Sequence, residues 1–176
     1  MDLFEAIKQR HSYREIFGAQ EITKHQLRQI VEAGLAAPSG CNAQTTEFVI
    51  VDEPGLVKKI AQLNTTNKAM QSAKAFILCV VDKNPQPTYG ELSFVVEDCA
   101  AAVENMLLAI SALGYASVWI DGWLRVDNRA QKIGEMIALP DSKVIRILLP
   151  IGMPTVQVQR REKKPFEQRA FWNRYK

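Results

Sequence analysis

The feature that most constrains the fold is a long, largely apolar helix predicted over residues 97–113. An Ala-Ala-Ala run and the later Met106, Leu107 and Leu108 place apolar side chains around most of its circumference. A helix of this kind must be buried on several sides. Since 176 residues form one ordinary domain with a modest core, part of this burial is expected against a second subunit. The alternative is that the helix forms the core of a monomer.

Four shorter helices are predicted from their caps and apolar spacing. Residues 2–10 and 23–36 each begin with a capping side chain and carry apolar residues at helical intervals. Pro54 has the fixed φ that suits a first helical turn. Asp127 can cap a fourth helix that ends near Leu139.

Four short apolar runs predict strands that alternate with these helices. They are residues 48–51, expected to be buried, and residues 75–81, 117–120 and 144–151. The unbroken apolar character of residues 75–81 predicts a central position in the sheet. No internal boundary divides residues 1–176, so a single layered domain of the mixed α/β or α+β class is expected.

Composition excludes several classes of protein. The 47% hydrophobic and 23% charged residues are typical of a globular chain, and a net charge of +3 is too small to argue for nucleic-acid binding. No apolar stretch reaches the roughly 20 residues of a membrane-spanning helix, and the N-terminus lacks a signal-peptide pattern. Three cysteines without a C-x-x-C, and two histidines, predict neither a disulfide framework nor a dense metal site. A reducing, cytoplasmic location is therefore expected.

Common nucleotide-binding and hydrolase signatures are absent from the sequence. There is no G-x-G-x-x-G, no G-x-x-x-x-G-K-[ST], no H-E-x-x-H and no G-x-S-x-G. A Rossmann phosphate turn, a P-loop, a zincin helix and a nucleophile elbow are therefore not expected.

The first candidate site is the Arg-His-Ser-Tyr-Arg run of residues 10–14, directly after the first helix. The guanidinium forks of Arg10 and Arg14 can hold a phosphate, and the Ser12 hydroxyl can add a hydrogen bond. The plainer alternative is a solvated helix end whose arginines balance the negative end of the helix dipole.

The second candidate is the turn over residues 37–44, Ala-Pro-Ser-Gly-Cys-Asn-Ala-Gln. Its polar side chains and exposed amides could face a planar heterocycle, although an ordinary helix-to-strand connection explains the same composition. Cys41 lies within the turn, where a small buried loop residue is favoured over a reactive thiol.

The third candidate is the basic run Arg-Arg-Glu-Lys-Lys-Pro at residues 160–165, inside a segment expected to be extended over residues 154–165. It could clamp the same phosphate as residues 10–14, while a solvated charge cluster is the simpler interpretation. Residues 166–175 are expected to form a terminal helix or an arm.

These segments resemble the nitroreductase superfamily of FMN-dependent oxidoreductases, in order and over essentially the whole chain. The resemblance rests on six motifs: R-H-S-Y-R at residues 10–14, A-A-P-S-G-C-N-A-Q at 36–44, N-M-L-L-A-I-S-A-L-G at 105–114, S-V-W-I-D-G-W at 117–123, I-G-M-P at 151–154 and K-K-P-F-E at 163–167. Each motif alone is weak, whereas six in the family's order are hard to obtain by chance.

The resemblance implies a three-layer α/β/α sandwich with a mixed central sheet, in a homodimer intertwined through its helices with FMN at the subunit interface. It implies NADH or NADPH as electron donor and a small-molecule acceptor such as a nitroaromatic or a quinone, served by ping-pong hydride transfer through flavin N5. The flavin carries the chemistry, so no catalytic side chain is implied. The terminal arm is expected to embrace the partner.

The same resemblance implies that both subunits hold the flavin. One subunit supplies Arg10, Ser12 and Arg14 near the ribityl phosphate, on which Arg161 and Lys163 close, and the partner subunit supplies Pro38, Ser39 and Asn42. The main chain around Ile120, Asp121 and Gly122 is expected near the isoalloxazine and Asn67 near its pyrimidine side. His11 is interpreted as a structural residue or one that contacts the flavin ring.

Two departures from the family pattern concern the substrate more than the cofactor. Thr45 and Thr46 stand where many members carry Pro-Trp, and residues 84–94 leave little room for a lid. The alternatives are therefore the same fold with other flavin chemistry, such as dehalogenation or enone reduction, or a flavin-binding protein without enzymatic activity.

Overall fold

The computed structural model describes residues 1–175, which are built around a four-stranded sheet. The strand order is β1-β2-β4-β3, and the strands are β1 (Glu47–Val51), β2 (Ala75–Asp82), β3 (Ala116–Ser117) and β4 (Lys143–Gly152). All three neighbouring pairs are antiparallel. The mixed sheet expected above is therefore corrected to an antiparallel one, to which an isolated bridge between Ser12 and Ser117 adds a parallel contact.

The strand β2 explains why the sheet lies between two helical layers. Its side chains alternate between the two faces, as in any strand. Ala75, Ile77, Cys79 and Val81 belong to one hydrophobic core, and Phe76, Leu78 and Val80 belong to the other. All seven are buried, because helices cover both faces. The central position predicted for this strand is confirmed, since β1 and β4 flank it.

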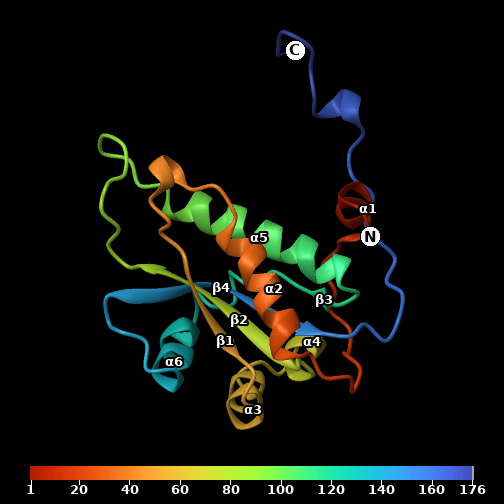
Figure 1. The fold of residues 1–176 in the computed structure, drawn as a ribbon. Coiled ribbons are helices and arrows are strands. Elements are labelled where there is room, and N and C mark those ends of the chain that lie inside the picture. Colours follow the sequence, from red (N-terminus) through yellow and green to blue (C-terminus); the bar gives the residue numbers. More distant parts are fainter. Residues whose placement is uncertain (176) are drawn as a thin grey trace.

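The helices form the outer layers of the sandwich (Figure 1). One core joins the sheet to α2 (Lys24–Leu35) and α5 (Val95–Ala112), and the other joins it to α3 (Pro54–Gln62), α4 (Lys68–Gln71) and α6 (Arg129–Met136). The short α1 (Leu3–Gln9) contacts α5. The three-layer arrangement is thus confirmed.

Capping side chains define the helix ends where the sequence predicts them. The Asp2 carboxylate accepts a hydrogen bond of 3.0 Å from the Glu5 amide. Thr23 and Gln26 form a complete capping box at the start of α2. Gly114 follows α5 with a φ of +82°, the left-handed conformation that suits glycine after a helix.

Two strand predictions need correction. The first strand is not fully buried, because it lies at the edge of the sheet and leaves Glu47 and Ile50 exposed. The third strand is shorter than residues 117–120, because after Ser117 it departs from the ladder and returns only at a bridge between Ile120 and Leu148.

The cap predicted for α6 is also wrong. Asn128, not Asp127, precedes the helix, and its φ of +56° places it in the left-handed region without a side-chain hydrogen bond to the helix. The Asp127 carboxylate forms an ion pair with the Arg129 guanidinium instead of capping the helix.

The Glu53 carboxylate caps α3, and this cap predicts a pH-dependent stability. Hydrogen bonds from the Gly55 and Leu56 amides, at 2.8 and 2.6 Å, lower the pKa of Glu53 below its ordinary value. A lowered pKa contributes stability above the ordinary value, and this contribution is lost as the pH falls through the folded-state value. We expect Glu53→Gln to lower the urea midpoint at about pH 7 and to match the wild type at about pH 3. An equal loss at both pH values would contradict the prediction.

The chain beyond β4 forms an arm. Residues 153–165 contain no regular element, a single 3₁₀ turn spans Phe166–Gln168, and the segment extends away from the layered body (Figure 1). Trp172 and Tyr175 within it are 82% and 88% exposed. Among residues 1–175, no helix has the length and apolar character needed to cross a membrane.

Candidate functional site

The segment over residues 10–14 is fixed against the sheet by Tyr13. This side chain is fully buried, its hydroxyl donates to the Ile16 carbonyl at 2.9 Å, and its amide donates to the Ser117 carbonyl at 2.9 Å. The neighbouring Arg10 and Arg14 consequently lie at the β3 edge. Arg14 is exposed.

A small cavity of about 180 Å³ lies beside this segment. Gln9, Arg10, His11 and Ser117 contribute to its lining, together with the C-terminal part of α5. The His11 Nε2 and Ser117 Oγ atoms are buried and have no hydrogen-bond partner among the described residues. Since His11 Nδ1 lies 2.9 Å from the Gln9 carbonyl, it must donate, and Nε2 of the neutral ring is an acceptor. The cavity therefore offers a hydroxyl, an acceptor and a guanidinium to a ligand that carries hydroxyls and an anion.

The helix α4 brings Asn67 toward the same edge. The Lys68 ammonium pairs with Glu15 at 2.7 Å, and the Phe17 amide donates to Ser72 Oγ at 2.8 Å. These contacts hold α4 against the chain that follows Arg14. The Asn67 side-chain oxygen caps the helix by accepting from the Met70 amide, which leaves its NH₂ group available for a ligand.

The chain over Ile120, Asp121 and Gly122 lies further along the sheet. Ile120 exchanges two hydrogen bonds with Leu148, of 3.1 and 2.9 Å. Within residues 1–175, the Asp121 and Gly122 amides donate to no protein acceptor. A side chain built at Gly122 would meet no atom within 4 Å, and Gly122 is exposed, so the surface at this residue is open. Unpaired amides beside an open surface suit the acceptor atoms of a flat ring.

The turn over residues 38–45 is held by a buried carboxylate at the start of α5. Asp98 Oδ1 accepts from the Gly40 amide at 2.8 Å, and Asp98 Oδ2 accepts from the Thr45 hydroxyl at 2.7 Å. Within the turn, Cys41, Asn42 and Gln44 adopt φ values of +51°, +57° and +50°. Positive φ values at three non-glycine residues are costly, and such conformations cluster at ligand sites.

The structure corrects the interpretation of Cys41 as a buried loop residue. Cys41 has a φ of +51° and is exposed, whereas Cys79 and Cys99 are fully buried. The pKa of the Cys79 thiol is raised, mainly by its hydrogen bond with Cys99 and secondly by burial.

We expect Cys41 to be the thiol that a water-soluble reagent modifies in the folded protein. Cys79 and Cys99 should react at least roughly 1000-fold more slowly than Cys41, because the fold must open before they are exposed. Thiol titration before and after denaturation measures this difference. Cys41→Ser should abolish the fast phase, and a fast phase that persists in this variant would refute the assignment.

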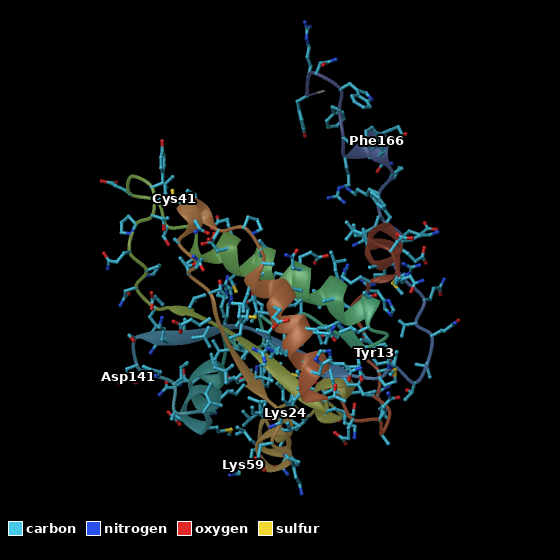
Figure 2. The ribbon with its side chains drawn as sticks, viewed as in Figure 1. Tyr13, Lys24, Cys41, Lys59, Asp141 and Phe166 are labelled. Atoms are coloured by element: carbon cyan, nitrogen blue, oxygen red, sulfur yellow. The ribbon has the colours of Figure 1, made fainter. Side chains whose placement is uncertain are left out.

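The two groups of candidate residues lie at opposite ends of α5 within one chain. Figure 2 shows Cys41, in the turn, near the start of α5 and Tyr13, in the basic segment, near its end. Pro38, Ser39 and Asn42 are therefore not brought to Arg10, Ser12 and Arg14 of the same chain. The arm departs beside the basic segment, since the Gly18 amide donates to the Met153 carbonyl at 2.8 Å, but its Arg161 and Lys163 are exposed.

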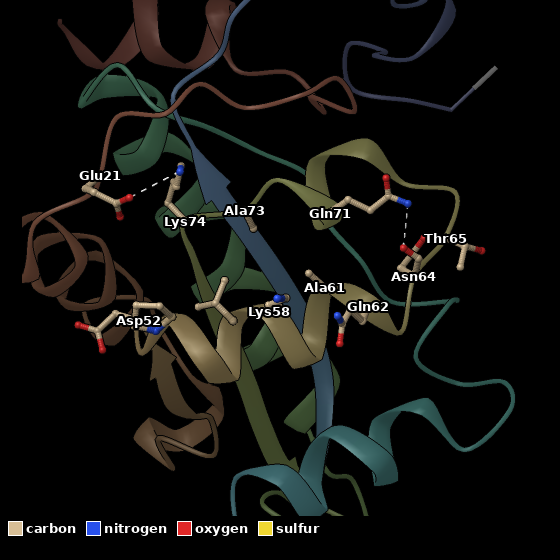
Figure 3. Close-up of a pocket in the computed structure, with 12 residues that line it drawn as sticks. Glu21, Asp52, Lys58, Ala61, Gln62, Asn64, Thr65, Gln71, Ala73 and Lys74 are labelled. Carbon is tan, nitrogen blue, oxygen red and sulfur yellow. Dashed lines mark hydrogen bonds and ion pairs between the residues drawn. The ribbon is translucent and has the colours of Figure 1, made fainter.

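A larger cavity, about 760 Å³, lies elsewhere (Figure 3). Val57 and Ala61 of α3 line it together with Ala73, and Lys74 pairs with Glu21 across its rim at 3.6 Å. None of the residues that the resemblance assigns to the flavin lines this cavity. We therefore identify the β3 edge and the turn, not this cavity, as the candidate site.

Three residues that shape the site were not predicted from the sequence. Asp98 holds the turn, Ser117 lines the small cavity, and Arg146 pairs with Asp121 at 2.9 Å. A carboxylate in the first turn of a largely apolar helix was the available signal for Asp98. The other two depend on strand register, which the sequence pattern does not define.

Comparisons with known proteins converge on one family. The model of the nitroreductase family matches residues 7–70 and 60–153. An Archaeoglobus fulgidus protein, provisionally named NADH dehydrogenase/NAD(P)H nitroreductase, is 29% identical over 85% of this chain and 86% of its own. A Vibrio harveyi NADPH-flavin oxidoreductase is 29% identical over 85% of this chain and 65% of its own. A Desulfovibrio desulfuricans structure in complex with FMN is 25% identical, with a TM-score of 0.79 over 99% of this chain and 98% of that one.

Proposed function

The chain belongs to the nitroreductase family, and from this premise we propose that it is an FMN-dependent oxidoreductase of electron-poor acceptors such as nitroaromatics or quinones. NADH or NADPH is the electron donor, and residues 1–176 act as one FMN-binding domain. When bound along the β3 edge, FMN would supply the hydride-transfer chemistry through its N5 atom, and the residues of that edge would hold it. The chain itself binds and orients the cofactor, so no side chain is assigned a proton-transfer role.

The observation that carries this proposal is the row of unpaired polar groups along the β3 edge. Ser117 Oγ and His11 Nε2 lie at one end, and the Asp121 and Gly122 amides lie at the other. A flavin nucleotide needs hydroxyl and phosphate partners at one end and donors to ring atoms at the other. Arg10 adds positive charge at the end where the phosphate would lie.

Two relatives support the cofactor and the donor. The name of the Vibrio harveyi protein combines NADPH with flavin, and the Desulfovibrio desulfuricans protein is described in complex with FMN. Both cover at least 85% of this chain. The same chemistry is therefore assigned to this chain.

The proposal is tested by loading the purified protein with FMN, removing unbound flavin and recording the visible spectrum. We expect about one retained FMN per chain, and bleaching of the flavin band when NADH or NADPH is added without oxygen. An acceptor such as a quinone should then restore the band. A folded protein that retains no flavin would overturn the proposal, and retained flavin that no nicotinamide bleaches would favour a non-enzymatic flavoprotein.

We further propose a homodimer in which the turn of one subunit completes the flavin site of the other. Exposed apolar side chains on two neighbouring helices support it: Leu3, Phe4 and Ile7 on α1, at 61%, 80% and 51%, and Val96 on α5, at 48%. Leu3, Phe4 and Ile7 form an exposed apolar patch on α1, and a patch of this kind marks an interface. Val96 lies at the opposite end of α5. A dimer also explains why the two groups of candidate residues are separated within one chain, since most soluble oligomers have twofold symmetry.

Replacing an exposed apolar side chain of α1 by a charged one is expected to weaken this dimer. The wild type should elute with twice the 19.8 kDa chain mass, and Phe4→Glu should shift it toward the monomer, because burying a phenylalanine contributes about 2–3 kcal/mol. Light scattering after size exclusion measures the mass. Met136→Glu, on the opposite helical layer at 37% exposure, serves as the control and should leave the mass unchanged. A monomeric wild type would refute the dimer.

A cytoplasmic location is the last part of the proposal. All three cysteines are free thiols, and one of them is exposed. Exposed thiols persist in reducing compartments, whereas secreted proteins tend to pair them. Fractionation of the native host, with the protein detected by antibody, tests this location.

A further inference from the structure

The chain that carries the two unpaired amides is weakly attached to the sheet by its main chain. Ile120 pairs with Leu148, but Asp121 and Gly122 leave the ladder and enter a series of turns, in which the Leu124 amide donates to the Asp121 carbonyl at 2.9 Å. The main chain therefore attaches these amides to the sheet only at Ile120, on their N-terminal side. Their orientation depends also on the contacts that hold the Asp121 side chain.

The Asp121 carboxylate is held by two guanidinium groups. Arg125 approaches in a bidentate manner, with Nε at 2.6 Å from Oδ1 and Nη2 at 2.8 Å from Oδ2. Arg146 Nη1 donates to Oδ1 at 2.9 Å. The Arg125 side chain is 54% exposed and belongs to the same loop, whereas Arg146 and Asp121 are 21% and 24% exposed. The pair with Arg146 is therefore the better shielded from water, and it joins the loop to the sheet.

An irregularity in β4 directs Arg146 toward the loop. Cys79 of β2 pairs with Ile147, and the next residue, Val80, pairs with Ile145, so Arg146 has no partner on β2. Such a β-bulge turns a side chain away from its regular alternation, and bulges occur often beside active sites. Arg146 precedes Leu148 by two residues, so one short stretch of β4 supplies both the main-chain and the side-chain attachment of the loop.

The charges of this cluster matter to a flavin because electrons are added to the ring. A carboxylate beside the ring opposes the gain of negative charge, and a paired guanidinium offsets that effect. Without Arg146, the Asp121 carboxylate would be paired only with Arg125. Because Arg125 is exposed, water and salt screen its attraction to the carboxylate.

We propose that Arg146 is a positioning residue for the flavin. Through Asp121 it orients the Asp121 and Gly122 amides toward the ring, and it balances the carboxylate charge next to that ring. The inference rests on the proposed function, because the flavin is its object. It goes further by assigning a role to a residue that no motif of the family resemblance contains.

The test compares Arg146→Met with Arg125→Met in the full-length protein. For Arg146→Met we expect FMN to bind about tenfold more weakly, because the amides lose their orientation. The two-electron midpoint potential of bound FMN should fall by about 30 mV, which corresponds to a tenfold change for a two-electron couple. Arg146→Lys should restore the potential, since it keeps the charge. Arg125→Met should change affinity less than about threefold, since exposed pairs contribute little.

A measurement without FMN separates this inference from the proposed function. Trp119 and Trp123 flank the loop, so in a Trp172→Phe background the fluorescence of the apoprotein reports the loop. Acrylamide should quench this fluorescence more strongly in Arg146→Met than in the wild type. Unchanged quenching, affinity and potential in Arg146→Met, or equal effects from Arg125→Met, would overturn the role of Arg146. A wild type that binds no FMN would overturn the proposed function instead, and the quenching alone would then decide whether Arg146 positions the loop.

Discussion

Replacement of Asp98 by alanine is expected to lower the free energy of unfolding by about 3–5 kcal/mol. Asp98 is 6% exposed, and its carboxylate accepts hydrogen bonds from the Gly40 amide and the Thr45 hydroxyl. Its removal costs two hydrogen bonds and leaves the Gly40 amide without a partner in a poorly hydrated place, which is more costly than the loss of the bonds alone. Urea denaturation followed by circular dichroism measures the change.

Two variants isolate the cause of this loss. Asp98→Asn keeps one acceptor oxygen for Gly40, so it should lose only about 1 kcal/mol. Glu97→Ala removes an exposed carboxylate from the same first turn of α5, and its effect should stay within about 0.5 kcal/mol. If all three variants lost the same stability, the helix dipole rather than the turn would be the origin.

The same substitution should also release FMN. In the proposed dimer, the turn held by Asp98 reaches the flavin of the partner subunit. Once Gly40 and Thr45 are no longer held, the positive φ values of Cys41, Asn42 and Gln44 lose the contacts that maintain them. Flavin retention after desalting, compared between Asp98→Ala and Asp98→Asn at a temperature where both are folded, measures this effect. Full retention by Asp98→Ala would exclude the turn from the site.

The layers of the fold follow from patterns within short stretches of sequence. The apolar circumference of α5 and the unbroken apolar run of β2 predict burial on several sides, and burial depends mainly on the residue itself. Capping at Asp2 and Thr23 is equally local, because the donor lies three residues from the acceptor. These features were therefore predictable. The direction of the strands was not, since a strand covered by helices on both faces has the same composition in a parallel and an antiparallel sheet.

The separate segments of the site were predictable from the sequence, whereas the contacts that position them were not. The arginines of residues 10–14 and the polar turn of residues 37–44 are visible as residue types suited to an anion and a ring. Asp98 acts on Gly40 from 58 positions away, and the role of Arg146 depends on a one-residue shift of register in β4. Contacts of this kind arise from tertiary packing, for which a single sequence has no periodic signal.

Replacement of Arg10 by alanine is expected to weaken FMN binding by roughly 10- to 150-fold, since a hydrogen bond to a charged group contributes about 1.5–3 kcal/mol. In the structure Arg10 Nε lies 3.4 Å from the carboxylate of Glu104, which is 50% exposed. A phosphate is a stronger partner than an exposed carboxylate, because it offers more charge and suits the guanidinium fork. Titration of the apoprotein with FMN, followed by flavin fluorescence, measures the dissociation constant.

Three companion variants decide whether Arg10 acts through its fork, through its own charge or as part of the general positive charge near the end of α1. Arg10→Lys keeps the charge without the fork, so it should fall between wild type and alanine. Glu104→Gln removes the competing partner and should leave binding unchanged or tighter. Lys8→Ala removes an exposed cation from the last turn of α1 and should change the dissociation constant less than about twofold. If Lys8→Ala and Arg10→Ala weakened binding equally, the effect would be one of general positive charge, whereas unchanged binding in Arg10→Ala would place the phosphate away from the small cavity.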